Sequence, residues 1–256
     1  MYLTWLDSNS WLIEMADQRV LLDPWLVGSL VFGNLPWLFK GERPNPPQIP
    51  APLDLILLSQ GLEDHAHPPT LEQLDRNIPV VASVNGAKVA RKLGYQQVTA
   101  LNYGEKMQSG GLEIMAVPGS PIGPTLVENG YVLREMATDH RLYYEPHGYH
   151  SSELKKLGKV DVIITPMIDL VLPLLGPIIQ GSQTAFEVAT WLQPQVMLPT
   201  ADGKEVEFQG LLISWLQTRG TVAELRTKLQ SHQLPTEIVE PWPGERLELL
   251  TGAGLS

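Results

Sequence analysis

The sequence predicts an α/β fold in four layers, an αββα sandwich in which two mixed β-sheets pack face to face and helices cover their outer faces. Two patterns lead to this prediction. Residues 3–23 are patterned as an antiparallel meander of apolar strands joined by polar turns. Between residues 55 and 198, fully apolar strands alternate with short amphipathic helices, and such strands need cover on both faces. A chain of 256 residues is long enough to bury a core of this size.

The expected strands follow in order along the chain. The meander consists of strands at 3–6, 11–15 and 19–23. Residues 27–52 then change to Gly, Asn and Pro interleaved with apolar side chains, which indicates an inserted, Pro-rich surface excursion that is ordered but not helical. After this excursion, strands are expected at 55–58, 79–83, 112–117, 131–134, 141–145, 160–164 and 195–198.

Two of the expected helices begin with a capping box, at Thr184 and at Thr221, where a hydroxyl and a glutamate three residues later satisfy each other's free backbone amides. We expect a single domain over 1–256, with a helical C-terminal part from about 203 to 256. The helices are expected at 86–93, 184–192 and 221–232.

Composition excludes several classes of function. The chain has 28 Asp and Glu against 18 Lys and Arg, a net charge of −10 without a basic run, so nucleic acid and anionic membranes are not expected partners. The weakly charged stretch 162–181 contains Asp169 and three prolines, so membrane insertion is not expected. The first residues lack a basic region typical of targeting signals, and we expect a cytoplasmic protein. Because Cys is absent, any metal has to be bound by His, Asp or Glu.

Two polar clusters follow buried strands, at the carboxyl ends where α/β sheets place ligand sites. The first contains Asp64, His65 and His67, and the second contains Glu145 and His147. Each cluster also has a plainer interpretation, the first as a solvated turn before a helix and the second as a surface loop that holds a hydrogen-bonded histidine. The position directly after a buried strand favours a site in both cases.

Several motifs occur in the order of one known family. The opening ones are Thr4-Trp-Leu6, Ser10-Trp-Leu-Ile-Glu14 and Arg19-Val-Leu-Leu-Asp-Pro-Trp25. Leu55-Ile-Leu-Leu-Ser-Gln-Gly-Leu-Glu-Asp-His65 follows, and later blocks lie at 116–119, 128–132, 143–144 and 196–199. In these motifs the chain resembles the metallo-β-lactamase superfamily, and most of all its L-ascorbate-6-phosphate-lactonase-like branch of metal-dependent hydrolases, up to about residue 200. The resemblance implies the αββα fold and a metal-dependent hydrolase.

The resemblance also implies that most of the family's metal ligands are lost. The two leading histidines of its His-x-His-x-Asp-His motif correspond to Gln60 and Leu62, a later histidine to Pro121, and the last one to Ala201. The bridging aspartate corresponds to His147. Since apolar side chains supply no donor atom, a dinuclear zinc centre is not expected.

The ligand positions that survive belong to the family's second metal. Asp64 and His65 match its ligands, His147 replaces the bridging carboxylate, and Asp202 lies one residue beyond the lost last histidine. Such a set makes a mononuclear site for one divalent metal, with zinc the best fit, and an open water position. The alternative is that no metal is retained and that Asp64 hydrogen-bonds to His65 or to backbone amides and so keeps the loop in shape.

Two functions follow, and the sequence leaves both open. The first is a divergent metal-dependent hydrolase for a small-molecule substrate, in which Asp64 and His67 handle protons while Gln60 and Glu145 contact the substrate. The second is a non-catalytic protein that keeps the fold and the cleft without metal and binds a small molecule or a protein partner.

The segment 167–180 is too apolar for an exposed loop and too rich in proline for a core helix. We expect it to line an apolar pocket or to form the interface of a homo-oligomer, and a buried irregular connection is the alternative. The excursion at Trp37-Leu-Phe39 is a candidate cover for the same cleft.

Overall fold

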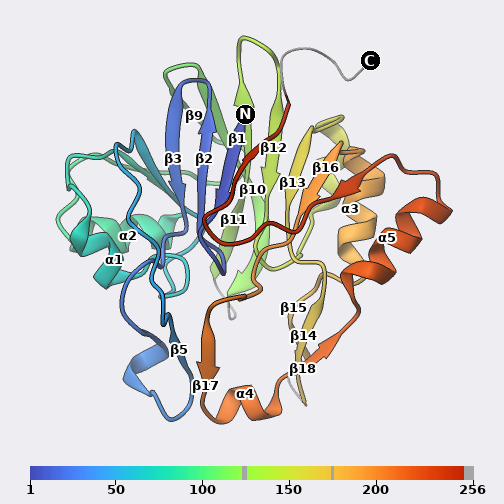
Figure 1. Cartoon of the computed structure of the whole chain (residues 1–256). Coiled ribbons are helices and arrows are strands. Elements are labelled where there is room, and N and C mark those ends of the chain that lie inside the picture. Colours follow the sequence, from blue (N-terminus) through green and yellow to red (C-terminus); the bar gives the residue numbers. More distant parts are fainter. Residues whose placement is uncertain (123–125, 174–175, 251–256) are drawn as a thin grey trace.

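The computed structural model describes residues 1–122, 126–173 and 176–250, and it contains the two predicted sheets packed face to face (Figure 1). The first sheet has the strand order β20-β1-β2-β3-β6-β7-β8, antiparallel from β20 to β3 and parallel from β3 to β8. The predicted meander is therefore present as β1 to β3. The strands of this sheet are β1 (Tyr2–Trp5), β2 (Trp11–Met15), β3 (Gln18–Leu22), β6 (Leu55–Leu58), β7 (Val80–Ala82), β8 (Val98–Ala100) and β20 (Arg246–Glu248).

The second sheet is also mixed. Its order is β19-β16-β13-β12-β11-β10-β9, parallel from β19 to β12 and antiparallel from β12 to β9. Its strands are β9 (Lys106–Ser109), β10 (Leu112–Ile122), β11 (Leu126–Glu135), β12 (Arg141–Tyr144), β13 (Val162–Ile164), β16 (Val196–Leu198) and β19 (Glu237–Ile238).

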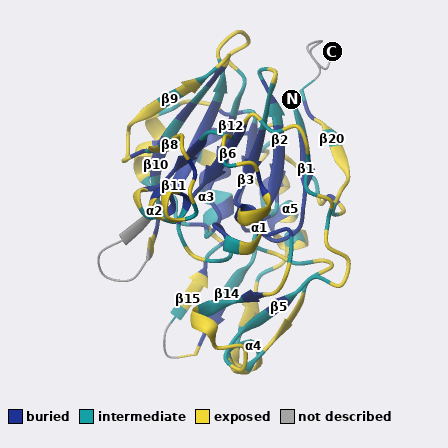
Figure 2. Ribbon diagram, turned by 90° about the vertical axis from the view of Figure 1, so that its left-hand side faces the viewer, coloured by how far each residue is buried: buried dark blue, intermediate teal, exposed yellow. Residues whose placement is uncertain are grey.

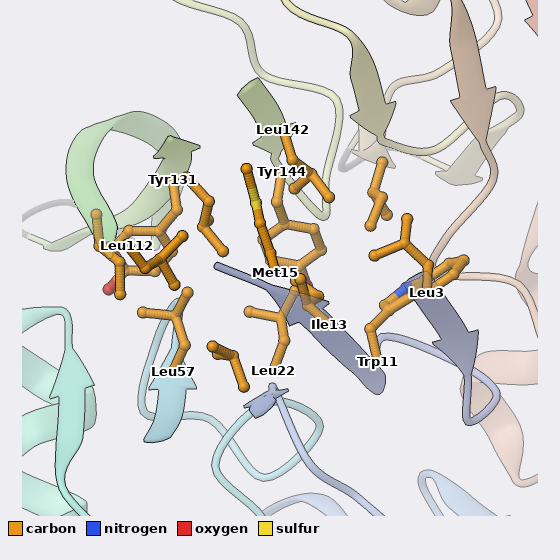
Figure 3. Packing of buried hydrophobic residues seen from close by; sticks show 14 of the residues in the cluster. Leu3, Trp11, Ile13, Met15, Leu22, Leu57, Leu112, Tyr131, Leu142 and Tyr144 are labelled. Atoms are coloured by element: carbon orange, nitrogen blue, oxygen red, sulfur yellow. The ribbon is translucent and has the colours of Figure 1, made fainter. Parts of the chain in front are cut away.

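The space between the sheets is filled by alternate residues of their strands, because successive side chains of a strand point to opposite faces. In β2, Trp11, Ile13 and Met15 point into this central core, whereas Leu12 points to the outer face of the sheet. Figure 3 shows how such side chains meet others of the second sheet, among them Tyr144. The predicted continuous apolar strand, β6, is fully buried on both faces.

Helices cover both outer faces, which completes the predicted αββα arrangement (Figure 1). Side chains of α1 (Pro68–Gln73) and α2 (Val84–Lys92) pack on the first sheet, and those of α3 (Thr184–Leu192) and α5 (Val222–Ser231) pack on the second. A short 3₁₀ helix, η2 (Ser152–Lys156), packs beside α3.

At one of the two predicted capping boxes, the hydrogen bond to the hydroxyl is present, whereas the described residues show no return bond to the glutamate side chain. The hydroxyl of Thr221 accepts a hydrogen bond from the Glu224 backbone N–H at 3.1 Å and caps α5. The box at Thr184 is wrong, because the residue before the helix is Gln183 and the Thr184 hydroxyl donates to the Gln180 carbonyl instead.

Two three-stranded sheets and one helix project from one end of the sandwich, at the bottom of Figures 1 and 2. We call them the lower lobe. The first small sheet has the order β17-β5-β4 and the second β15-β14-β18, and helix α4 joins β17 to β18. The elements are β4 (Leu30–Val31), η1 (Phe32–Asn34), β5 (Lys40–Glu42), β14 (Asp169–Leu172), β15 (Gly176–Ile179), β17 (Glu207–Gln209), α4 (Leu211–Trp215) and β18 (Gln217–Arg219).

The lower lobe brings together segments that are far apart in sequence. The predicted excursion 27–52 supplies β4 and β5, and β5 pairs with β17 in the register Phe208 opposite Gly41. A Cβ on Gly41 would lie 2.7 Å from the Trp25 ring, so this position requires glycine. The excursion is therefore ordered, as expected, and forms one wall of the lobe.

The part from 203 to 256, for which the sequence predicts helix, is only partly helical. It contains α4 and α5, but also four short strands, β17 to β20, of which β20 pairs with β1 in the register Tyr2 opposite Glu248. Two short segments for which the sequence makes predictions lie outside the described residues, so the structure does not test these predictions. They are residues 251–256 of the expected domain and residues 174–175 of the apolar segment. Among the helices of the described ranges, none has the length and apolar character needed to span a membrane.

Candidate metal site

Three side chains from two loops converge at the end of the sandwich that faces the lower lobe. Asp64 and His65 lie in the turn between β6 and α1, and His147 follows β12. Ligand atoms of the three residues all lie within 4.8 Å of one another. His65 Nε2 is 3.0 Å from Asp64 Oδ2, and the two imidazole centroids are 5.2 Å apart. The structure thus brings together three of the four metal ligands that the sequence suggests.

The imidazole of His65 is fixed from behind by a buried carboxylate. Its Nδ1 lies 2.7 Å from Asp23 Oδ2, at the end of β3. The same carboxylate accepts hydrogen bonds from the Ser59 backbone N–H (2.7 Å), the Ser59 hydroxyl (2.5 Å) and the Tyr144 hydroxyl (2.6 Å). Because a carboxylate accepts, Nδ1 carries a proton, and His65 presents Nε2 to Asp64.

The imidazole of His147 is held in the same way. Its Nδ1 lies 2.8 and 3.0 Å from the two oxygens of Glu128, which is fully buried on β11. Burial raises the pKa of Glu128, but His147 outweighs this and lowers the pKa below its usual value, so the carboxyl is ionised. Nδ1–H therefore donates to Glu128, and Nε2 makes no hydrogen bond to the described part of the chain.

The pKa values of His65 and Asp64 are set by the charged side chains next to them. Burial alone lowers the pKa of His65, but the Asp64 and Asp23 carboxylates together raise it well above 6.5. Burial raises the pKa of Asp64, and His65 followed by His147 outweighs this and lowers it. Without an ion, His65 is thus an imidazolium held between two carboxylates.

The three residues fit a single divalent cation. Two imidazole nitrogens and one carboxylate oxygen are a ligand set that zinc and other first-row divalent ions take, with room for a further ligand. Asp64 Oδ1 is buried and has no hydrogen-bond partner among the described residues. Since buried oxygens without partners are rare, this atom favours a bound positive group at the site.

A second group of potential ligands consists of Glu128, Glu145 and His147. Burial, followed by the neighbouring Glu128 carboxylate, raises the pKa of Glu145 well above its usual range. Its Oε2 accepts backbone N–H groups of Gly148 and Tyr149 and thereby shapes the turn that carries His147. Glu145 Oε1 is buried without a hydrogen-bond partner in the described residues, but both oxygens of Glu128 already contact His147 Nδ1. Because Glu128 and His147 Nδ1 are paired with each other, the first group is the better metal candidate.

The structure gives His67 a different position from the one expected of a proton carrier. Its Nδ1 accepts the Thr70 hydroxyl at 3.0 Å, because Thr70 Oγ1 already accepts the Leu26 backbone N–H at 2.9 Å. Its Nε2 donates to the Ser29 carbonyl at 3.3 Å. Burial lowers the pKa of His67 to about 4. His67 is therefore a neutral structural residue that fastens the excursion to α1, and the expected catalytic role does not fit its contacts.

Asp202 is also not part of the convergent group. Its carboxylate accepts the Gly203 backbone N–H at 2.9 Å, and burial, with Asp7 nearby, raises its pKa. The preceding residue, Ala201, has a positive φ of 61° and turns the chain at this point. The expectation that Asp202 replaces the lost last histidine is not supported by this geometry.

The two residues expected to contact substrate are buried away from any opening. Gln60 is 1% exposed and its Oε1 has no hydrogen-bond partner in the described ranges. Glu145 is fully buried in the turn described above. Neither lines the cavity at the site.

A cavity of about 280 Å³ opens directly at Asp64 and His147 and extends into the lower lobe. Ser8 and Asn9 complete its polar end. Leu62 and Ala201, at two positions that the resemblance assigns to lost histidines, are part of its wall. Its remaining lining residues are apolar and come from both small sheets, η1 and the α4 region.

The apolar segment 167–180 is one of these walls, through Leu170, Ile178 and Ile179. The expectation that it lines an apolar pocket therefore agrees with the structure, and a homo-oligomer interface stays a prediction. From the Trp37-Leu-Phe39 excursion only Phe39 lines the cavity, while Trp37 is 63% exposed on the outside of the lobe.

Asp23 and Glu128, which contact the two candidate histidine ligands, were not predicted as site residues from the sequence. Both residues occur only inside motifs that match the family. A signal was available for Asp23, which directly follows the apolar run Val20-Leu-Leu22, where an unpaired carboxylate is costly. Glu128 is followed by Asn129 and Gly130 and has no such signal.

Comparison with known proteins assigns the chain to a family. Residues 2–201 match the family model described as the beta-lactamase superfamily domain. A search among curated proteins gives no match. The family match lies at the level of the superfamily, so the lactonase-like branch stays a prediction.

Solved structures share the fold at low sequence identity. A metallo hydrolase, Igni18 from Ignicoccus hospitalis KIN4/I, is 17% identical with a TM-score of 0.67, covering 96% of this chain and 97% of that one. An isothiocyanate hydrolase from Delia radicum gut bacteria is 19% identical with a TM-score of 0.67, covering 97% and 99%. A possible metal-dependent hydrolase from Veillonella parvula DSM 2008 is 13% identical with a TM-score of 0.70, covering 97% and 99%.

The predicted superfamily and its αββα fold are thus confirmed by the family match, the layer order and the structural neighbours. The chain belongs to the beta-lactamase superfamily.

Proposed function

We propose that the protein is a divergent metal-dependent hydrolase with one divalent ion, which acts on a small molecule. One observation carries the proposal: Asp64, His65 and His147 converge within 4.8 Å at the polar end of a cavity, and both imidazoles have Nδ1 fixed by a buried carboxylate. Carboxylates placed behind histidines in this way are typical of metal-binding imidazoles.

The residues have separate roles in this proposal. Asp64, His65 and His147 hold the ion, for which zinc fits the ligand types best. When bound, such an ion polarises a carbonyl and makes water more acidic. Asp23 and Glu128 hold Nδ1 of the two imidazoles, so that Nε2 would face the ion, and the buried Asp64 Oδ1 is positioned to accept a proton or a ligand hydrogen bond.

The reaction class is supported by the fold neighbours, since two of the three named above are described as hydrolases and the third as a possible metal-dependent hydrolase. The single ion is supported by the side chains at the positions where the family carries its other ligands: Leu62 and Ala201 line the cavity without donor atoms. A cytoplasmic location stays a prediction from the sequence.

A second function is favoured by one contact. His65 Nε2 lies only 3.0 Å from Asp64 Oδ2, so the imidazolium of His65 satisfies two carboxylates with no ion present. A non-catalytic binding protein, which keeps the cavity and uses this ion pair as a structural link, is consistent with that contact.

Cobalt titration separates the two functions. Protein stripped with a chelator is titrated with Co²⁺ at pH 7.5, and we expect about one ion per chain with visible d–d absorbance. His147→Ala and Asp64→Asn should each weaken binding by about a hundredfold or more, since each removes a direct ligand. His232→Ala, which removes an exposed imidazole at the end of α5, is the matched control and should bind like the wild type.

Hydrolysis is then measured with neutral esters and lactones, with cobalt, with zinc and with chelator. Activity that requires the ion and disappears in His147→Ala supports the hydrolase. No binding of cobalt, or binding that His147→Ala leaves unchanged, would exclude it and leave the binding protein as the remaining function.

A further inference from the structure

The cavity at Asp64 and His147 has extensive apolar walls, which binding of a metal ion alone does not require. We propose that it binds the apolar body of a small molecule of about bicyclic aromatic size, with a carbonyl oxygen at the end that faces Asp64 and His147. The assignment of the polar end rests on the proposed function, whereas the assignment of the apolar body rests on the walls.

Aromatic side chains form one wall. The centroids of Phe32 and Phe39 lie 5.0 Å apart, and those of Phe39 and Phe208 lie 5.7 Å apart. All three residues line the cavity, and the chain has only four phenylalanines. The pairing of β5 with β17 holds Phe39 and Phe208 together across the lobe.

Several of the lining side chains are apolar and unusually exposed. Leu62 is 41%, Ile178 43% and Phe208 37% exposed. They come from three separate segments and face one cavity. Apolar surface gathered in a concave site is unfavourable in water, and a ligand that covers it gains the corresponding free energy.

The polar groups are confined to one end of the cavity. Ser8, Asn9, Asp64 and His147 lie where the sandwich closes it, while residues of the lower lobe that line it are apolar. A ligand that matches this distribution is polar at one end only. A sugar or a nucleotide, which carries polar groups along its whole length, does not match it.

The volume sets the size of the apolar body. The cavity measures about 280 Å³. A protein cavity of roughly 150 Å³ accommodates one benzene molecule. The present cavity therefore has room for about two fused aromatic rings, or for an alkyl chain of similar volume.

The test uses 2-acetylnaphthalene, a neutral naphthyl ketone that carries no hydrolysable bond, and follows its fluorescence as protein is added. Acetone, which has the same carbonyl without the rings, is the comparison. Leu62→Asn and Ile178→Asn place an amide in two different walls, and Leu211→Asn is the matched control, because Leu211 is 40% exposed in the same lobe but does not line the cavity.

We expect 2-acetylnaphthalene to bind, acetone not to compete at equal concentration, and each wall variant to weaken binding by about tenfold, with the control within about twofold of the wild type. Melting curves establish which variants fold, and either wall variant alone is sufficient. Absent binding of the ketone, or equal effects of the wall variants and the control, would overturn the proposal.

The titration is run both in chelator and with cobalt. Ketone binding with the expected variant pattern in chelator, together with no cobalt binding, keeps the apolar ligand and removes the proposed hydrolase. Cobalt binding that depends on His147, together with no ketone binding, keeps the hydrolase and removes the apolar ligand.

Discussion

At the scale of single residues, two pairs matter most for the candidate site. Each pair consists of a histidine and a buried carboxylate that contacts its Nδ1. Asp23 contacts His65 and Glu128 contacts His147, each through Nδ1. Such a carboxylate sets the tautomer and makes the exposed nitrogen a better ligand. The affinity of the proposed metal site is therefore expected to depend on the carboxylates behind the atoms that would contact the ion.

We predict that Glu128→Gln lowers cobalt affinity by about 10–100-fold, because the amide keeps the shape but removes the negative charge from His147. The measurement is the cobalt titration described above. Asp161→Asn is the control, since Asp161 Oδ2 lies 3.4 Å from Nδ1 of another histidine, His140, at the surface. Equal affinity of Glu128→Gln and the control would show that Glu128 only supports the loop.

A second prediction concerns His150 and pH. Its Nδ1 accepts the Tyr143 hydroxyl at 2.9 Å, and burial lowers the pKa of His150 to about 3. The folded pKa is below the unfolded value of about 6.5, so the unfolded chain binds the proton first as the pH falls. The stability contributed by neutral His150 is therefore complete above about pH 6.5 and is lost as the pH falls toward 3.

His150→Gln, which cannot titrate, should accordingly lose about 3 kcal/mol less unfolding free energy than the wild type between pH 7 and pH 4. Urea unfolding at several pH values measures this difference. If the unfolding free energies of the variant and the wild type change equally with pH, His150 takes up no proton on unfolding in this range.

The sequence predicted Asp64, His65 and His147 as neighbours because they follow the ends of two strands, and such ends were expected to lie on a common rim at one end of the sheets. It did not predict Asp23 or Glu128 as their partners, since those contacts join residues 42 and 19 positions apart in the chain. The contacts depend on which strands become neighbours, β3 with β6 in the first sheet and β11 with β12 in the second. Local pattern carries no information about which acid a histidine meets after folding. His67 illustrates the converse, as its spacing suits a ligand while its hydrogen bonds tie down the excursion.

At the scale of elements, the lower lobe depends on contacts between 27–52 and the α4 region. The Leu211 and Leu212 backbone amides donate to the Trp37 and Leu38 carbonyls, each at 3.0 Å. Gly210, with φ of 115°, permits this approach, because a Cβ there would lie 2.6 Å from the Leu38 carbonyl oxygen. This one glycine allows the two segments that enclose the cavity to meet.

Gly210→Ala is therefore expected to separate these segments, and the Leu211 and Leu212 amides should exchange hydrogen with solvent at least about tenfold faster. Gly158→Ala is the control, because Gly158 also has a positive φ, of 75°, but open space around it. Hydrogen exchange read by mass spectrometry over the lobe distinguishes them. Unchanged exchange in Gly210→Ala would show that the lobe adapts to the added methyl group.

Elements differ in how well the sequence predicted them, and burial is the reason. Strands such as β6, four residues all fully buried, have a continuous apolar pattern that is readily recognised. The lobe strands β17 and β18 are exposed over their whole length, so no periodicity marks them and their segments were expected to be helical. Their pairing is decided by partners distant in sequence, β5 and β14.

At the scale of the whole molecule, one core between the two sheets accounts for most of the cohesion. It takes side chains from strands of both sheets and from residues as distant as Leu3 and Leu249. Shared burial of this kind makes the two sheets unfold together.

Leu57→Ala should therefore destabilise the entire sandwich by about 2–5 kcal/mol, since Leu57 is fully buried at the centre of this core. Leu62→Ala, in the turn that follows β6 and 41% exposed, should change stability by less than about 1 kcal/mol. Urea unfolding followed by tryptophan fluorescence and by far-ultraviolet circular dichroism measures both variants. Two separate transitions in Leu57→Ala would show that the sheets unfold independently.

The pairing of β1 with β20 has a consequence for how the protein is made. Tyr2 and Glu248, neighbours in the first sheet, lie 246 residues apart in the chain. During synthesis on the ribosome, β1 emerges early and β20 emerges only after nearly all the other strands. Until then β1 is an open edge with unpaired backbone groups and mostly buried-type side chains, which favours pairing with other nascent chains. The pairing of β20 thus closes an edge of the first sheet that stays open while the strands between β1 and β20 are made.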